Sequence, residues 1–371
     1  MNPLQQLRAA GQSIWLDFLR RGLIAGGALE RWIREDGVGG VTSNPSIFGK
    51  AIAGSADYDD AIRAIAGKGP REPIDVFYDL ALTDIQMAAD VFRPLYDATE
   101  GKDGFVSFEL EPKLAHDTAG SIAKAGELFG ELAKPNVMIK VPGTAEGVAA
   151  VEELTAAGVN VNITLLFSPL RHEQVALAYL RGLERRLDAG DPLGGVASVA
   201  SFFVSRVDTA VDALLPDDSL LRGKVAIANA KVAYRRFREI FSGERWERVA
   251  AAGAGVQRPL WASTGTKNPA YSDVVYVEEL VGPDTVNTMP QATLDAFRDH
   301  GTVRPAAVAE RIEEAEALLA SLPEAGIDLP AIAATLVEDG IGAFEADLAK
   351  LLSVIEDKAS LSSPVRLGLP N

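Results

Sequence analysis

Short apolar runs rich in β-formers alternate along the chain with segments in which apolar residues recur every three or four positions. The first pattern is typical of buried strands and the second of amphipathic helices. Strands are predicted at Ser13–Phe18, Gly40–Asn44, Phe105–Leu110, Val137–Val141, Val159–Phe167, Ala197–Val204, Pro259–Thr264 and Thr285–Met289. Helical segments between them include Asp117–Leu132, Thr144–Ala157, Arg171–Ala189, Lys224–Phe241 and Asn268–Leu280. This repeated strand-then-helix pattern predicts an α/β fold of the (β/α)8 barrel type.

The competing arrangement is an open doubly wound sheet, whose first strand-to-helix turn carries a glycine-rich phosphate fingerprint. The run Gly37-Val-Gly-Gly40 precedes a predicted strand instead of following one, so it is interpreted as a helix-to-strand turn. No dinucleotide site is predicted.

Two segments exceed a minimal barrel. Residues 47–104, between the second and third predicted strands, form a mainly helical insertion, and residues 294–371 form a helical C-terminal extension. The last residues, Ser362–Asn371, are expected to be a poorly ordered or docked tail. No linker demands a second domain, so residues 1–371 are predicted to be one barrel domain covered by both additions.

The amino-acid composition argues against several classes of function. The net charge is -16, which argues against a nucleic-acid or anionic-membrane partner. The absence of cysteine excludes disulfides and thiolate chemistry. The start of the chain lacks the pattern of a secretory signal, and no apolar run approaches the roughly 18 residues of a membrane span, so a cytoplasmic protein is expected.

Lys140 is an isolated charge within the apolar run Asn136–Val141. An ammonium group inside a protein is costly unless it is paired or becomes neutral, and a neutral lysine amine attacks carbonyl carbon. The alternative is a lysine at a strand end with its head in water.

Polar residues also lie at the ends of the other early strands, where a barrel places its reacting groups. They are Asp17, Asn44 and Glu109, and the fifth predicted strand carries Asn162 and Thr164. Asn162 and Thr164 share one strand face because they are two residues apart.

Each of these positions has a structural alternative. Asp17 could cap a helix that begins near Phe18, and Asn44 could start a turn at Pro45. Of the two carboxylates in Glu109-Leu-Glu111, either could be a surface group. One shared site explains the strand-end positions more simply than separate coincidences.

A lysine, two carboxylates, amides and a hydroxyl suit amine catalysis. The lysine forms an iminium with a ketone, which promotes cleavage of a neighbouring C–C bond, while the carboxylates move protons. This chemistry requires no metal or other cofactor. The three histidines, His116, His172 and His300, lack ligand spacing and are interpreted as surface or core residues.

Two later loops offer hydroxyls beside a cation, which suits phosphate oxygens. Ser201 lies near the end of the sixth predicted strand and precedes Arg206, and Ser263 lies near the end of the seventh and precedes Lys267. A helix start with a solvated lysine also explains the second loop, and Arg206 could instead pair with Asp208.

Six motifs resemble those of the transaldolase family, in the family's order and across nearly the whole chain. They are Trp15-Leu-Asp17, Gly40-Val-Thr-Ser-Asn-Pro-Ser46, Val106-Ser-Phe-Glu109, Ile139-Lys-Val-Pro-Gly-Thr144, Asn162-Ile-Thr-Leu-Leu-Phe-Ser168 and Ser201-Phe-Phe-Val-Ser-Arg206. Glu109-Leu-Glu111 departs from the more familiar Glu-Val-Asp, and the seventh loop, with Ser263, Thr264 and Lys267, resembles the longer bacterial form.

The resemblance implies roles by position. Lys140 resembles the Schiff-base lysine, Glu109 the acid/base that acts through a water, and Asp17 the group that takes a substrate hydroxyl proton. Asn44 and Asn162 resemble the residues that hold donor hydroxyls.

The remaining implied positions concern water and phosphate. Thr164 resembles the residue that positions the catalytic water, and Ser201 with Arg206 resembles the phosphate site. Ser263 and Lys267 are further candidate phosphate ligands.

The resemblance implies a cofactor-independent transferase of the pentose phosphate pathway, with sugar phosphates as its partners. It would move a dihydroxyacetone unit from sedoheptulose 7-phosphate or fructose 6-phosphate to glyceraldehyde 3-phosphate or erythrose 4-phosphate. One alternative is a Schiff-base aldolase that releases free dihydroxyacetone. Another is a catalytically silent protein that binds phosphosugars.

Overall fold

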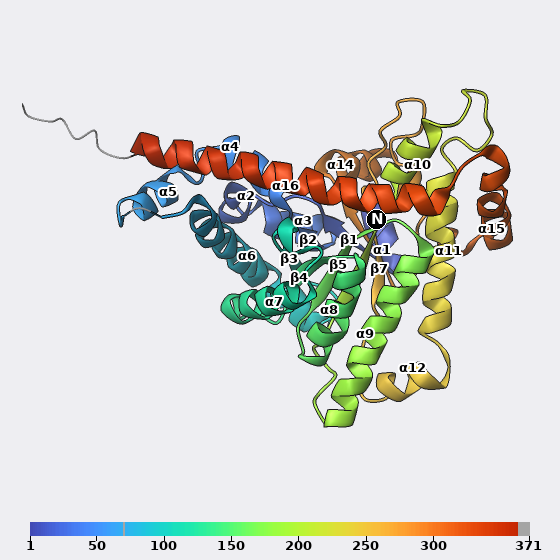
Figure 1. Ribbon diagram of the computed structural model, residues 1–371, viewed down its shortest axis with the longest axis horizontal. Coiled ribbons are helices and arrows are strands. Elements are labelled where there is room, and N and C mark those ends of the chain that lie inside the picture. Colours follow the sequence, from blue (N-terminus) through green and yellow to red (C-terminus); the bar gives the residue numbers. More distant parts are fainter. Residues whose placement is uncertain (70, 363–371) are drawn as a thin grey trace, which may run out of the picture.

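The computed structural model describes residues 1–69 and 71–362, and within it eight parallel strands close into a barrel. Each strand pairs with the next in the sequence, and the first pairs with the last (Figure 1). The strands are β1 (Gln12–Leu16), β2 (Val38–Thr42), β3 (Phe105–Glu109), β4 (Val137–Pro142), β5 (Val161–Leu166), β6 (Ser198–Phe203), β7 (Arg258–Ala262) and β8 (Thr285–Met289). The predicted (β/α)8 barrel is confirmed.

Helices surround this barrel. The first half of the chain contributes α1 (Pro3–Ala9), α2 (Arg21–Ala25), α3 (Ala28–Asp36), α4 (Pro45–Ala53), α5 (Asp59–Ala66), α6 (Pro73–Ala98), η1 (Pro112–Leu114), α7 (Thr118–Leu132), α8 (Ala145–Ala156) and α9 (Pro169–Ala189). The second half contributes α10 (Ser205–Asp212), α11 (Val225–Ile240), α12 (Gly243–Ala250), α13 (Val275–Glu278), α14 (Gln291–His300), η2 (Ala307–Ala309), α15 (Ile312–Ser321), η3 (Leu322–Ala325) and α16 (Leu329–Ser362).

The predicted helix at Asn268–Leu280 is wrong over most of its length, because only α13 is helical there. Local side chains satisfy the backbone in turns instead: Ala270 N donates to Asn268 Oδ1 at 3.0 Å, and Val274 N donates to Ser272 Oγ at 3.4 Å. Asn and Ser side chains compete with helical hydrogen bonds in this way, and Pro269 has no N–H to donate.

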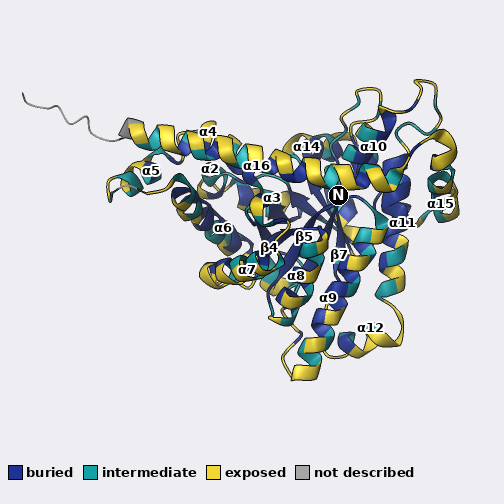
Figure 2. Cartoon of the chain, viewed as in Figure 1, coloured by how far each residue is buried: buried dark blue, intermediate teal, exposed yellow. Residues whose placement is uncertain are grey.

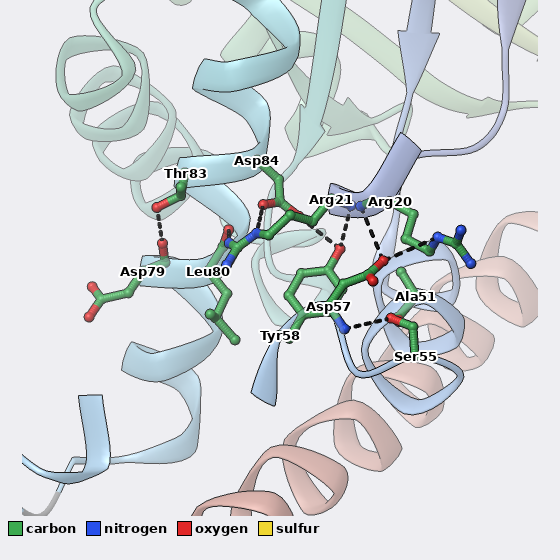
Figure 3. Close-up of polar contacts among 11 residues, drawn as sticks. Arg20, Arg21, Ala51, Ser55, Asp57, Tyr58, Asp79, Leu80, Thr83 and Asp84 are labelled. Carbon is green, nitrogen blue, oxygen red and sulfur yellow. Dashed lines mark hydrogen bonds and ion pairs between the residues drawn. The ribbon is translucent and has the colours of Figure 1, made fainter. Parts of the chain in front are cut away.

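A buried ionic network fixes the segment that follows β1 (Figure 3). Arg21, at the start of α2, donates from Nε to Asp84 Oδ1 of α6 at 2.7 Å. Tyr58, which precedes α5, donates to the other carboxylate oxygen at 2.8 Å and accepts from Arg21 N at 3.1 Å. Burial raises the pKa of Asp84 and the neighbouring Arg21 guanidinium opposes that rise. The network joins α2, α5 and α6, so the helical insertion supports the loop that carries Asp17.

A second buried polar group lies at the bottom of the barrel, on the side of the N-terminal ends of the strands. Trp15 Nε1 donates to Asp103 Oδ1 at 2.8 Å, and Arg258 reaches the same carboxylate at 3.7 Å. Gly40 has no room for a side chain, because a Cβ there would lie 2.7 Å from the Trp15 indole and from Phe105 O. The indole fills the space that this glycine leaves.

The C-terminal extension ends in one long helix that runs along the top of the molecule. In Figure 1, α16 passes across the barrel alongside α4 and toward α5, and it also contacts α6, α10 and β5. Figure 2 shows exposed and buried positions alternating along it, and Ile341, Phe344, Leu351 and Ile355 form its buried stripe. The predicted tail, Ser362–Asn371, lies outside the described residues, apart from the Ser362 backbone at the end of α16.

Among the described residues no single helix is long and apolar enough to cross a membrane, although the bent pair Ile312–Ala325 and Leu329–Ser360 meets that test jointly.

Candidate active site

Strand register brings three of the predicted site residues side by side. Glu109 of β3 pairs with Lys140 of β4, and Lys140 pairs with Asn162 of β5. Glu109 is the last residue of β3 and Lys140 lies two residues before the end of β4, whereas Asn162 is the second residue of β5 and so does not lie at a strand end. All three are within the barrel interior, where each is less than one-tenth exposed. The arrangement follows from parallel pairing, because residues in register on neighbouring strands present their side chains to the same face.

Lys140 and Glu109 form a buried ion pair. Lys140 Nζ donates to Glu109 Oε2 at 2.9 Å and to the backbone oxygen of Ser43 at 3.1 Å. Burial raises the pKa of Glu109, while the charge and hydrogen bond of Lys140 oppose the rise. Glu111 lies outside this pair, since its carboxylate contacts Tyr78 and Lys113. The ambiguity between the two glutamates is therefore resolved in favour of Glu109 as the buried group.

The amide of Asn162 is fixed by two serines of the barrel interior. Its Nδ2 donates to Ser107 Oγ at 3.0 Å, and its Oδ1 accepts from Ser201 Oγ at 2.7 Å. Thr164, two residues further along β5, has a buried hydroxyl with no hydrogen-bond partner among the described residues. A buried hydroxyl without a partner requires explanation, and a water or substrate oxygen would supply the missing bond.

Asp17 belongs to a chain of hydroxyls that sequence reasoning missed. Thr42 Oγ1 donates to Asp17 Oδ1 at 2.6 Å and lies 2.8 Å from Thr288 Oγ1. Thr42 has one hydroxyl hydrogen, so the donor between the two threonines is Thr288. The alternative of Asp17 as a helix cap is wrong, because α2 begins only at Arg21 and its N-cap is Arg20.

Asn44 serves the backbone as well as the cavity. Its Oδ1 accepts from Ile47 N at 2.9 Å and caps α4. This N-cap use of the oxygen leaves the Nδ2 group of the same side chain as the donor available to a ligand.

The candidate phosphate residues lie on the β6 and β7 side of the barrel mouth. Arg206 stacks on Phe203 with its guanidinium carbon 5.3 Å from the ring centroid. It does not pair with Asp208, whose carboxylate accepts from Ala226 N and from Tyr276 Oη. Burial lowers the pKa of Arg206, and Asp17 and Glu109 oppose that change. Arg206 is therefore a cation without a carboxylate partner among the described residues.

The loop after β7 is held in place by a serine pair. Ser263 has a positive φ of 55°, which is uncommon for residues other than glycine. Its hydroxyl lies 2.9 Å from Ser205 Oγ, and its carbonyl accepts from Ser205 N at 3.0 Å. This contact places the loop that contains Lys267 beside the start of α10, which contains Arg206.

These groups surround a cavity of about 520 Å³ at the barrel mouth. Of the predicted site residues, those that line it are Asp17, Asn44, Lys140, Thr164, Ser201, Arg206, Ser263 and Lys267. Glu109 and Asn162 lie behind this lining and reach it through their hydrogen bonds to Lys140 and Ser201.

Several lining residues were not predicted from the sequence. Thr42 and Thr288 lie near the ends of predicted strands, and that position could have marked them. Lys50 of α4, Gln291 of α14, and Phe344 and Asp347 of α16 had no such signal. Phe344 and Asp347 are three residues apart and so lie on the same face of α16, but the sequence does not say what that face packs against. Only the packing of α16 over the barrel shows that they line the cavity.

Comparisons with known proteins agree with this geometry. The model of the transaldolase/fructose-6-phosphate aldolase family matches residues 14–355. A transaldolase of Acidothermus cellulolyticus is 47% identical over 95% of this chain and 96% of its own, and one of Saccharopolyspora erythraea is 47% identical over 96% and 97%. Transaldolase 2 of Nostoc punctiforme is 45% identical over 98% and 99%. The predicted transferase of transaldolase type is confirmed by these matches, and the chain belongs to the transaldolase/fructose-6-phosphate aldolase family.

Proposed function

We propose that this transaldolase transfers a dihydroxyacetone unit between sugar phosphates through a Schiff base on Lys140. The observation that carries the proposal is the buried pair of Lys140 Nζ and Glu109 Oε2, 2.9 Å apart, at the edge of a cavity with cations on its far side. A lysine held beside a carboxylate in this way has both a nucleophile and a proton acceptor within hydrogen-bond reach.

Imine formation begins with proton transfer from Lys140 to Glu109, which burial makes easier by raising the pKa of that carboxyl group. The free amine attacks the ketone carbon of the donor to give a carbinolamine. Glu109 returns its proton, through a water, to the departing hydroxyl group, so water leaves and an iminium remains. The unpartnered hydroxyl of Thr164 positions that water.

Carbon–carbon cleavage then requires a base at a substrate hydroxyl. Asp17 accepts the proton of the hydroxyl group on the carbon that becomes the aldehyde, and the bond between that carbon and the dihydroxyacetone part breaks. The aldose phosphate leaves, and the bond electrons convert the iminium into an enamine. The hydrogen bond from Thr42 keeps the Asp17 carboxylate oriented toward the cavity. The enamine then attacks the carbonyl carbon of an acceptor aldehyde, which forms the new C–C bond and an iminium of the product. Hydrolysis of this iminium releases the product and frees Lys140.

The rest of the cavity binds the two ends of the sugar. Asn44, which lines the cavity, holds hydroxyls of the dihydroxyacetone part through its Nδ2 group. Asn162, behind the lining, assists with the Nδ2 hydrogen that Ser107 does not accept.

Arg206 binds the phosphate, assisted by Ser263 and Lys267, which line the same cavity. Ser201 joins them by turning its hydroxyl hydrogen from Asn162 Oδ1 to a phosphate oxygen. The donors would be sedoheptulose 7-phosphate or fructose 6-phosphate, and the acceptors glyceraldehyde 3-phosphate or erythrose 4-phosphate, in the cytoplasm.

Borohydride trapping tests the covalent step. Reduction in the presence of fructose 6-phosphate should attach a three-carbon adduct to the Lys140 peptide, detected by mass spectrometry. Lys140→Ala should lose the adduct and the turnover, whereas Lys267→Ala should keep the adduct at saturating sugar. An adduct on another lysine, or turnover in Lys140→Ala, would refute the proposal.

A second assay separates the transferase from an aldolase that releases free dihydroxyacetone. With fructose 6-phosphate alone, a transferase stops after about one turnover because its enamine awaits an acceptor. Adding glyceraldehyde 3-phosphate should restore steady turnover. Continuous release of dihydroxyacetone without an acceptor would favour the aldolase.

A further inference from the structure

A second cavity, of about 460 Å³, lies between α11 and α15 and shares no lining residue with the catalytic cavity. The two helices pack side by side at the edge of the molecule (Figure 1). The segment after β7 closes the cavity, through Tyr271, Ser272 and Val275.

The charge of this lining is opposite to that of the whole chain. Four cations line the cavity, Arg222, Lys224, Lys231 and Arg311, against two carboxylates, Glu279 and Glu314. The chain carries a net charge of -16, so a local excess of cations is not expected from composition.

One of the two carboxylates already contacts a cation with each of its oxygens. Glu279 Oε1 accepts from Arg304 Nη2 at 2.6 Å, and its other oxygen lies 3.5 Å from Lys231 Nζ. By contrast, Lys224 and Arg311, at the rim, have no side-chain partner among the described residues. Their charges are therefore available to a ligand.

Two features make the cationic wall rigid. Arg222 donates from Nη1 to the backbone oxygens of Asp212 and Leu215, at 2.8 and 3.0 Å. Asp212 in turn accepts from Gly223 N and from Tyr271 Oη, at 3.1 and 2.7 Å. Lys231 is only 6% exposed, and burial lowers its pKa, so an anion beside it would stabilise its charged form.

The remaining lining is apolar and comes from both helices. Ile227 and Ala228 of α11 face Ala315 and Leu318 of α15, and Val275 completes this wall. A few fixed polar groups on a mainly apolar hollow are the general form of a small-molecule site.

From this combination we propose that the cavity between α11 and α15 is a second ligand site, for a small organic anion that joins a phosphate, sulfonate or carboxylate to an apolar group. The cations bind the anionic head and the apolar wall covers the body. The site does not depend on the Schiff-base chemistry.

The fluorescent probe 8-anilinonaphthalene-1-sulfonate has this chemistry and tests the site on the full chain. We expect one saturable binding event. Arg311→Gln and Lys224→Gln should each weaken it by about tenfold, as expected for the loss of one charge-assisted contact. Neither side chain has a side-chain partner in the part of the chain that the structure describes, so both variants should keep wild-type thermal stability.

Two control variants make the test decisive. Arg31→Gln removes an exposed arginine, also without a side-chain partner among the described residues, and should leave the affinity unchanged. Arg206→Gln alters the catalytic cavity and should also leave it unchanged. Wild-type affinity in both Arg311→Gln and Lys224→Gln, or loss of binding in Arg206→Gln, would overturn the proposal.

Discussion

Burial in the barrel removes water from a few ionisable side chains, and their chemistry then depends on the protein groups that they contact. Glu109 and Lys140 compensate each other, and Ser43 O gives the lysine a second anchor. Because that anchor remains, Glu109→Gln should leave Lys140 in place while removing its proton acceptor.

For Glu109→Gln we therefore expect kcat to fall by about 10²- to 10⁴-fold, the usual contribution of a general acid or base, with a small change in KM. Steady-state kinetics with both sugar phosphates measure this. Glu111→Gln is the matched control, since that carboxylate contacts Tyr78 and Lys113 instead. A loss below tenfold in Glu109→Gln would contradict its proposed role.

His172 provides a pH prediction of a different kind. It is fully buried against Phe202, both ring nitrogens lack a partner among the described residues, and burial lowers its pKa from 6.5 to about 4. The unfolded chain thus binds a proton more readily than the folded chain between these values. Stability from this residue is present above pH 6.5 and is lost as pH falls toward 4, by roughly 3 kcal/mol.

Urea unfolding from pH 7 to pH 4 measures this loss. His172→Leu should flatten the decline relative to wild type, because it removes the proton-binding group. His300→Gln should not, since that ring is exposed and bound to Asp273 and Asp299. The same slope in His172→Leu as in wild type would show that another group governs acid stability.

At the scale of elements, α16 completes the catalytic cavity and its position rests on a close contact with β5. A Cβ at Gly340 would lie 2.7 Å from Leu165 Cδ2, whereas a Cβ at Gly342 would meet nothing within 4 Å. Gly340→Leu should therefore push α16 outward and displace Phe344 and Asp347 from the cavity wall.

For Gly340→Leu we therefore expect the KM for fructose 6-phosphate to rise by about tenfold. Overpacking should also lower the free energy of unfolding by about 1–3 kcal/mol. Gly342→Leu changes helix propensity equally but faces open space, so its KM should stay within twofold of wild type. Kinetics and thermal unfolding of the pair check this, and equal KM values would mean that α16 does not shape the site.

For the whole molecule, a barrel separates chemistry at one end from stability at the other. Asp103 at the bottom of the barrel accepts from Trp15 and pairs with Arg258. Asp103→Ala should destabilise the fold by about 2–4 kcal/mol, because it leaves the buried Trp15 N–H without its acceptor and the mostly buried Arg258 without its carboxylate, although Arg258 keeps its hydrogen bond to Ser13 Oγ.

The folded fraction of Asp103→Ala should nevertheless keep kcat within twofold at 25 °C, because the catalytic cavity is at the opposite end. Asp97→Ala removes an exposed partner of Arg93 and should cost less than about 0.5 kcal/mol. Chemical denaturation and activity assays on the same samples test both statements. A large fall in kcat would show that the two ends are coupled.

Local patterns in the sequence determined the barrel and most of its strands, since β8 lies where it was predicted and β4 ends one residue later. Strand ends also marked Lys140, Glu109, Asp17 and Thr164, because polar groups interrupt otherwise apolar runs there. The turn residues Asn268 and Ser272 favour turns over the predicted helix at Asn268–Leu280, because their side chains accept from nearby backbone N–H groups.

Only the tertiary structure decided the contacts between distant segments. Register placed Glu109 beside Lys140, barrel closure brought Thr288 to Thr42, and the packing of α16 added Phe344 to the cavity. The physical reason is that periodicity reports the face that one segment buries, whereas its partner is chosen by the combined packing of the whole chain.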